Sequence, residues 1–265
     1  MMMHSFSTLG CPELDLDGVV ALAARHGFHA VELRALCGRL DLPAFFKESF
    51  ETPEKWAEYL HARRIKVCAL GTSFKLIGAT EAERAELLEY VRWADAADVN
   101  WLRVFDGGTT GTPEAIAEAA ATMEWWRAER LKNFWAVDLL VEPHDALATN
   151  AALKAFLEKA PQTSLLWDSH RTWKHGGEDP VGTWALVRDR TVHVHVKDSV
   201  SKPSEKFPYT YVIPGEGEFP MAALRDALKT DRFGGVLSLE WDRYWHPYLP
   251  ELDKALYAAA RTRWW

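Results

Sequence analysis

Residues 192–198 read Val-His-Val-His-Val-Lys-Asp, a strict alternation of valines with polar side chains. Alternation of this length predicts a β-strand with the valines on one face and His193, His195 and Lys197 on the other. An edge strand whose polar face meets water would give the same pattern. Other apolar runs of the chain also end in polar residues, and this favours a polar face that is directed at a shared site.

Three further apolar runs each close on a carboxylate. They cover residues 139–144, 164–170 and 236–242, and they read Leu-Leu-Val-Glu-Pro-His, Ser-Leu-Leu-Trp-Asp-Ser-His and Val-Leu-Ser-Leu-Glu-Trp-Asp. If all four runs are strands, they deliver four polar side chains at their carboxyl ends. These four are Glu142, Asp168, His195 and Glu240.

Strand-like and helix-like segments alternate along the whole chain, and this pattern predicts a (β/α)8 TIM barrel that forms a single domain over residues 1–265. The predicted strands cover residues 4–10, 29–34, 66–71, 101–106, 135–142, 164–168, 192–198 and 236–242. A doubly wound open sheet is the alternative. The barrel is preferred because four consecutive strands supply the candidate residues, whereas an open sheet collects its ligands mainly at one switch point.

The segments between these strands contain residue patterns that predict the starts of helices. Thr52 and Thr112 each precede a proline, and Thr80 with Glu83 forms a capping box. Two long loops are expected, over residues 35–51 and 199–218, on the face where such barrels build their substrate sites.

Composition narrows the class of partner. The 265 residues carry a net charge of −7 and contain no basic run, which argues against nucleic acid or an anionic membrane surface as a partner. No leader-like start and no apolar stretch of about 20 residues is present, so we expect a cytoplasmic protein. Three cysteines without metal-like spacing suggest free thiols. A small polar substrate and a homo-oligomer remain open.

Three carboxylates and one imidazole in one place would repel one another without a cation. An oxygen-rich set with one histidine and no thiolate suits one divalent metal ion, with Mn²⁺ favoured and Mg²⁺, Co²⁺ or Zn²⁺ as alternatives. The other interpretation is that the four groups lie on the surface and are unrelated.

The order of these residues resembles the xylose isomerase-like barrels, the sugar phosphate isomerase/epimerase superfamily that includes ketose 3-epimerases, inosose dehydratases and hydroxypyruvate isomerases. The shared features are Pro-His after Glu142, the HVHVKD strand, Leu-Glu-Trp around Glu240, and the segments 27–33 and 214–217. The resemblance implies that Glu142, Asp168, His195 and Glu240 hold the metal, and that His193 lies deeper in the barrel. It also implies that Glu142 and Glu240 carry protons during catalysis.

The related endonucleases of abasic DNA hold three zinc ions with additional histidines. This chain has Gly71-Thr72-Ser73 and Phe105-Asp106-Gly107 at those places and lacks the required Asp-x-His. A trinuclear site is therefore not expected, and the acidic charge also opposes DNA binding.

Five further residues are candidates for contact with substrate: His144, Arg34, His170, Lys197 and Trp173. Each has a structural alternative. His144 could orient a metal ligand, Arg34 could pair with Glu32, and Lys197 could pair with Glu216 or Asp198. For His170 the prediction assumes that its strand continues beyond Asp168.

These observations lead to a metal-dependent isomerase or epimerase of a small sugar or polyol, in which a proton leaves the carbon next to a carbonyl and the metal stabilises the enediolate. A dehydratase or β-eliminating lyase that begins with the same proton abstraction is the alternative. A barrel that binds sugars without catalysis is a third hypothesis.

Overall fold

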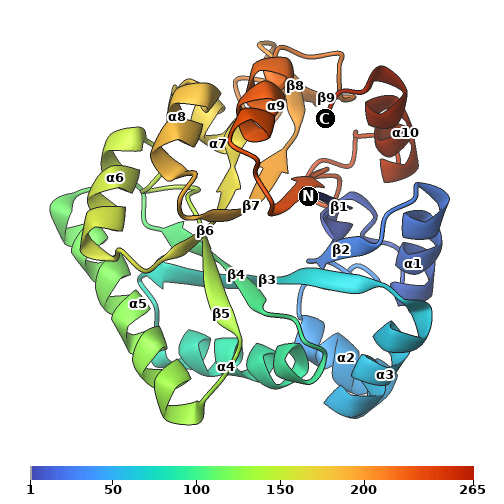
Figure 1. The fold of residues 1–265 in the computed structure, drawn as a ribbon, viewed down its shortest axis with the longest axis vertical. Helices are drawn as coiled ribbons and strands as arrows, with labels where there is room; N and C mark the ends of the chain where they lie inside the picture. Colours follow the sequence, from blue (N-terminus) through green and yellow to red (C-terminus); the bar gives the residue numbers. More distant parts are fainter. Residues whose placement is uncertain (1) are drawn as a thin grey trace.

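The computed structural model describes residues 2–265 and confirms the barrel (Figure 1). Eight parallel strands form one sheet in the order β1-β10-β7-β6-β5-β4-β3-β2. The first and last strands of this order meet through a parallel bridge between Ser7 and Glu32, which closes the sheet. The strands are β1 (Met3–Phe6), β2 (Ala30–Leu33), β3 (Lys66–Ile77), β4 (Trp101–Gly107), β5 (Asp138–Glu142), β6 (Ser164–Asp168), β7 (Thr191–Val196) and β10 (Val236–Leu239).

The helices surround the strands in chain order, from α1 round to α10 (Figure 1). They are α1 (Leu16–Arg25), α2 (Leu42–Phe50), α3 (Pro53–Arg63), α4 (Glu81–Ala96), α5 (Pro113–Asn133), α6 (Asn150–Lys159), α7 (Ser169–Lys174), α8 (Pro180–Val187), α9 (Met221–Thr230) and α10 (Leu252–Thr262). A 3-10 turn (Thr8–Gly10) follows β1. Within residues 2–265, no helix has the length and apolar character to cross a membrane.

The predicted helix starts are confirmed by their caps. The side chains of Thr52 and Thr112 accept hydrogen bonds from the backbone of the first turns of α3 and α5. Thr80 and Glu83 form a reciprocal capping box at α4. Such caps satisfy N–H groups that have no partner inside a helix.

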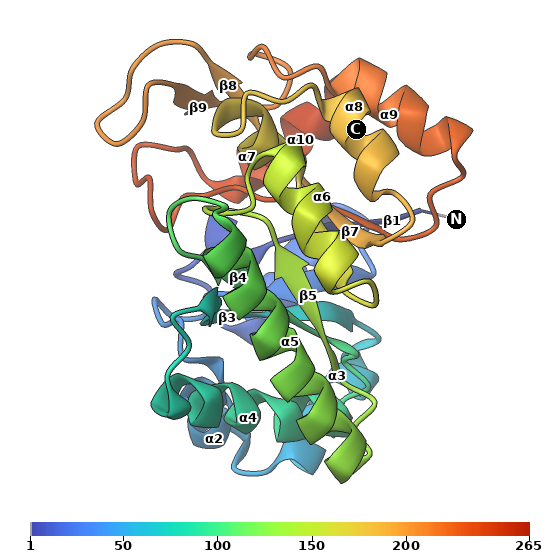
Figure 2. The same cartoon turned by 90° about the vertical axis from the view of Figure 1, so that its left-hand side faces the viewer.

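Both long loops contain structure that the sequence pattern did not reveal. Helix α2 occupies most of residues 35–51, and its first turn is capped by Asp41. The second loop contains an antiparallel hairpin of β8 (Asp198–Val200) and β9 (Thr210–Val212). Figure 2 shows this hairpin and α7 on the same side of the molecule. Both additions lie at the carboxyl ends of strands, where they can wall a site.

The apolar core lies between the sheet and the ring of helices. The largest side chains that are fully buried include five tryptophans, Trp56, Trp93, Trp126, Trp167 and Trp241. Burying aromatic side chains of this size is a large favourable term in folding. With Trp184 and Trp264, which are also buried, seven of the thirteen tryptophans therefore act in packing.

Candidate active site and metal centre

Three of the four predicted ligands converge at the carboxyl ends of the strands. Glu142, His195 and Glu240 each offer one atom, and these atoms lie within 4.8 Å of one another. All three residues are at most 5% exposed. The fourth, Asp168, is not part of this group. It is linked to Glu240 by Lys197, whose Nζ is 3.0 Å from Asp168 Oδ2 and also contacts Glu240.

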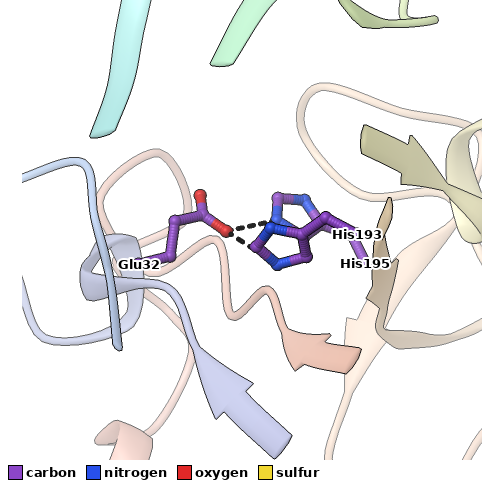
Figure 3. Close-up of side chains that lie close together, drawn as sticks. All are labelled: Glu32, His193 and His195. Atoms are coloured by element: carbon purple, nitrogen blue, oxygen red, sulfur yellow. Dashed lines mark hydrogen bonds and ion pairs between the residues drawn. The ribbon is translucent and has the colours of Figure 1, made fainter. Parts of the chain in front are cut away.

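His195 is oriented by a residue on the opposite side of the barrel. Its Nε2 lies 2.5 Å from Oε2 of Glu32, and the same oxygen is 3.5 Å from Nε2 of His193 (Figure 3). The other ring nitrogen, Nδ1, lies 3.3 Å from Oε2 of Glu240. A carboxylate that fixes one histidine nitrogen so that the other can bind a metal is a common arrangement.

The sequence analysis considered Glu32 only beside Arg34, and the structure places it against the histidines of the candidate site. The predicted alternative, an ion pair between Glu32 and Arg34, is wrong, because Glu32 faces the two histidines instead. His193 lies below His195 and shares a hydrogen bond with Ser238 Oγ at 2.6 Å, which agrees with its expected deeper position. The strict alternation within β7 already indicated that the rings of His193 and His195 lie on the same face of the strand.

The donor atoms fit a divalent cation. Oε2 of Glu142 and Nδ1 of His195 are buried and make no hydrogen bond to any residue that the structure describes. Among the described residues these atoms have only ion-pair contacts, Glu142 Oε2 with Arg103 Nε and His195 Nδ1 with Glu240, and a bound cation would give each a strong partner. The trio Glu32, His193 and His195 also lies close together, but its facing atoms already bond one another, so we assign it to positioning.

The predicted alternative, that Lys197 pairs with Glu216 or Asp198, is wrong, because its ammonium group lies among three other carboxylates. Its Nζ lies 3.0 Å from Asp168 and 2.9 Å from Asp242, and it donates a hydrogen bond to Glu240. Burial opposes the charge of this lysine, but Asp168, Asp242 and Glu240 outweigh burial and hold its pKa well above the usual value. Asp242, two residues beyond Glu240, is a second member of the site that the sequence analysis missed.

The two candidate catalytic glutamates, Glu142 and Glu240, lie beside different charged groups, which shift their pKa values in opposite directions. Burial, with the nearby charge of Glu240, raises the pKa of Glu142 to about 7, although Arg103 Nε is only 3.2 Å away. Burial acts on Glu240 in the same direction, but Lys197 and His195 overcome it and hold its pKa well below the usual value. Unequal environments of this kind are how paired carboxylates acquire different roles.

A cavity of about 470 Å³ opens above these residues. Glu142, Asp168 and Glu240 form part of its wall. Among the residues predicted to contact substrate, His144, Arg34 and Lys197 line it. This volume suits a small molecule such as a monosaccharide.

His170 and Trp173 are placed behind the wall of this cavity. The expectation that β6 continues past Asp168 is wrong, because Asp168 Oδ1 accepts hydrogen bonds from the backbone N–H groups of His170 and Arg171 and so begins α7. His170 Nε2 then lies 2.8 Å from Ser199 Oγ, and Trp173 packs edge-on against the His170 ring. Their role in binding substrate remains a prediction, and this placement gives it no support.

Asp198 explains why the HVHVKD strand and the Pro-Gly-Glu-Gly segment occur together. Its Oδ2 accepts hydrogen bonds from the N–H groups of Gly215 at 2.9 Å and Gly217 at 3.0 Å, and its Oδ1 accepts one from Phe219. A single buried carboxylate thereby closes the loop after β7. The loop presents Tyr211 and other residues to the cavity.

Asp106, at the end of β4, fixes the loop after β5 in the same way, through hydrogen bonds from backbone N–H groups. Its carboxylate accepts hydrogen bonds from the N–H groups of His144 at 3.1 Å, Asp145 at 3.0 Å and Leu147 at 2.6 Å. These bonds fix the chain directly beyond Glu142 and place His144 on the cavity wall. In the sequence, Asp106 stands at the end of an apolar strand, as Glu142, Asp168 and Glu240 do.

Comparison with solved structures gives the same fold over nearly the whole chain. A probable 3-DHS dehydratase involved in petrobactin synthesis from Bacillus anthracis superposes with a TM-score of 0.76 at 17% identity, covering 98% of this chain and 99% of that one. The IolI protein with a bound zinc atom gives 0.76 at 17% identity, with 99% and 96% covered. A D-psicose 3-epimerase in the presence of D-fructose gives 0.71 at 14% identity, with 99% and 98% covered.

These identities are low, so the structural likeness concerns the fold. Comparison with curated protein sequences finds no match. A family model nevertheless covers residues 20–264, which is most of the chain and includes every residue of the site described above. The chain therefore belongs to the xylose isomerase-like TIM barrel family.

Proposed function

We propose that this protein is a divalent-metal-dependent sugar isomerase or epimerase that moves a proton on the carbon next to a carbonyl. The observation that carries the proposal is the pairing of Glu142 and Glu240 around His195 at the floor of the cavity. Strands β5 and β10 are separated by two strands in the sheet, so the two carboxylates approach a ligand from different directions. Carboxylates placed in this way can serve two faces of one carbon.

Glu142, Asp168, His195 and Glu240 would hold the cation. When bound, a divalent metal supplies positive charge that stabilises an oxyanion beside the reacting carbon. Mn²⁺ is the ion we favour for this donor set, and Mg²⁺, Co²⁺ and Zn²⁺ are alternatives.

The side chains of the protein itself supply the proton transfers. Glu142 lines the cavity, where its carboxylate can accept a proton from the substrate. Glu240 can return the proton or serve the opposite face. Lys197 lines the cavity at the same place, so its positive charge can polarise a carbonyl group of the substrate. Phe207, Tyr211 and Trp245 form apolar parts of the wall that help to exclude water.

Similar folds support this reaction class and also supply its alternative. The D-psicose 3-epimerase changes a sugar, and the probable dehydratase has the same fold. A dehydratase would begin with the same proton abstraction and then lose a β-hydroxyl group. Product analysis separates the two, since only elimination yields a conjugated product that absorbs in the ultraviolet.

Solvent exchange tests the proposal. The protein, loaded with Mn²⁺, is incubated in D₂O with a panel of ketoses and hydroxylated cyclic ketones, and the products and recovered substrate are examined by NMR. We expect deuterium on the carbon next to the carbonyl, and we expect Glu142→Gln and Glu240→Gln to abolish it. The exposed Glu158→Gln is the matched control and should exchange like the parent. Turnover without deuterium in either compound would contradict the two-glutamate mechanism and favour an internally returned proton or a hydride shift.

A further inference from the structure

Arg34 is a buried cation without an anionic partner. The residue follows β2 and is only 3% exposed. Its guanidinium donates hydrogen bonds to Ser73 Oγ at 2.8 Å and to the carbonyl oxygen of Leu40 at 3.4 Å. No Asp or Glu from residue 2 to residue 265 forms an ion pair with it. An uncompensated buried charge is expensive, and buried arginines are normally paired.

The neighbouring arginine makes this imbalance larger. Arg103 is 1% exposed, and its one ion-pair partner among the described residues is Glu142. Burial, followed by the charge of Arg103, lowers the pKa of Arg34 to about 10, so that the side chain still carries its charge at neutral pH. Two guanidinium groups therefore face one carboxylate on this part of the wall.

The backbone is shaped to admit both guanidinium groups. A Cβ atom at Gly71 would lie 2.6 Å from Arg34 Cδ and 3.0 Å from Arg103 Nη2. Glycine at this point of β3 thus lets the two side chains cross the strand. Arg103 is held further by its bond to the carbonyl oxygen of Thr72 at 3.0 Å and by stacking over Phe105 at 4.0 Å.

Arg34 and Arg103 both line the cavity that holds Glu142 and Glu240. Because Arg103 adjoins Arg34 on one side and Glu142 on the other, a group bound at Arg34 lies beside the reactive glutamate. We propose that Arg34, assisted by Ser73, binds a carboxylate of the substrate, so that the enzyme acts on a polyhydroxylated keto acid or sugar acid. This inference rests on the proposed function and deepens it by naming the class of substrate.

A carboxylate matches the donors better than a phosphate group does. A guanidinium presents a planar fork that suits the two oxygens of a carboxylate, and the Ser73 hydroxyl adds one neutral donor. Phosphate dianions commonly rest on several backbone N–H groups at a helix N-terminus. Arg34 follows a strand and Ser73 lies within one, so neither supplies such a cradle.

Binding of three sugars that differ only at C6 tests this assignment: D-glucuronate, D-glucose and D-glucose 6-phosphate. Calorimetry and thermal shift are performed on the Mn²⁺-loaded parent. We expect D-glucuronate to bind at least about tenfold more tightly than the other two, since a hydrogen bond to a charged group contributes more than a neutral one. Arg34→Met should remove that preference, and Arg34→Lys should restore part of it.

Lys75→Met is the matched control, because Lys75 is an exposed cation on the same cavity wall, and it should keep the preference. The Tm of ligand-free Arg34→Met separates binding from structure, since removal of an uncompensated charge should leave the Tm unchanged or raise it. The proposal is overturned by equal binding of the three sugars, by tighter binding of the phosphate, or by a preference that survives Arg34→Met. These binding measurements do not depend on turnover. Equal binding of the three sugars would contradict the carboxylate site alone, whereas the absence of deuterium exchange would contradict the proposed reaction alone.

Discussion

The side chains of His195 on β7 and Glu32 on β2 meet across the interior of the barrel, with Nε2 and Oε2 2.5 Å apart. Their positions in the sequence differ by 163 residues. The contact assigns the Nε2 proton to the side of Glu32 and leaves Nδ1 directed towards Glu240. A residue with no direct contact to the proposed cation thus determines which histidine atom can bind it.

Glu32→Gln should weaken metal binding without removing a ligand. The amide keeps the size of the side chain but loses the negative charge that holds His195, and loss of such a partner typically costs about 10- to 100-fold in affinity. Titration with Mn²⁺ followed by calorimetry measures this. Ser238→Ala, which removes only the partner of His193, is the control and should bind nearly as the parent does. Unchanged affinity in Glu32→Gln would show that His195 needs no such support.

The parent protein should bind about one divalent ion per chain. His195→Ala and Glu240→Gln should each bind that ion much more weakly, because each variant loses a donor from a closely spaced set. The ion should also raise the Tm of the parent, since a ligand that binds only the folded state stabilises it. Elemental analysis and thermal shift provide the readouts. Parent-like binding by both variants would refute the proposed ligand set.

Lys197→Met should destabilise the metal-free protein by roughly 3–5 kcal/mol, the typical cost of removing one partner from buried ion pairs. The variant leaves Asp168, Glu240 and Asp242 without their shared cation. Added Mn²⁺ should therefore restore more stability to this variant than to the parent. Urea unfolding with and without metal measures the difference, and Lys206→Met is the control. A variant as stable as the parent without metal would contradict this role of the ammonium group.

The sequence analysis located the barrel more completely than the site. Period-two alternation and helix caps are local signals, and they placed β7 and the starts of α3, α4 and α5 within a residue or two of their observed bounds. The position of each carboxylate or histidine at the end of an apolar run then grouped Glu142, His195 and Glu240, and the structure places one donor atom of each within 4.8 Å of the others. Both placements depend on patterns that each segment carries within itself.

The missed features depend on contacts between distant segments. An ion pair between Glu32 and Arg34 was one alternative suggested by their proximity in sequence, yet the partners of Glu32 come from β7. The segment after β2 was expected to be a loop, yet it contains the short helix α2. The sequence does carry a start signal for this helix, the cap Asp41 with a proline in the first turn, and the sequence analysis overlooked it. His170 was misplaced because the two backbone bonds to Asp168 end the strand, and alternation within the strand could not reveal them.

Acid should destabilise the protein partly through His246, which is 5% exposed. Burial, then the charges of Lys206 and Lys197, lowers its pKa to about 4. The unfolded chain binds this proton near pH 6.5, so stability from neutral His246 is present above that pH and is lost as the pH falls towards 4. His246→Phe should flatten the decline in unfolding free energy between pH 6.5 and 4.5, and the exposed His61→Gln should not. An unchanged slope in His246→Phe would rule out this contribution.

Gly217→Ala should disrupt the loop after β7. A Cβ atom there would lie 2.1 Å from Oδ1 of Asp198 and 2.7 Å from the carbonyl oxygen of Ser199, so the anchor must open. We expect faster proteolysis within residues 199–218. Gly234→Ala is the matched control, because a Cβ atom at that glycine meets nothing within 4 Å. Equal rates of cleavage in the two variants would show that Asp198 does not hold the loop.

Asp198 also bears on how new specificities could arise in this scaffold. The bonds from Asp198 to the N–H groups of Gly215, Gly217 and Phe219 fasten the loop at its base. The hairpin between those anchors contributes Lys206, Phe207 and, from β9, Tyr211 to the wall of the cavity. We therefore expect that a hairpin of another length or sequence on the same base changes the substrate without moving Glu142 and Glu240.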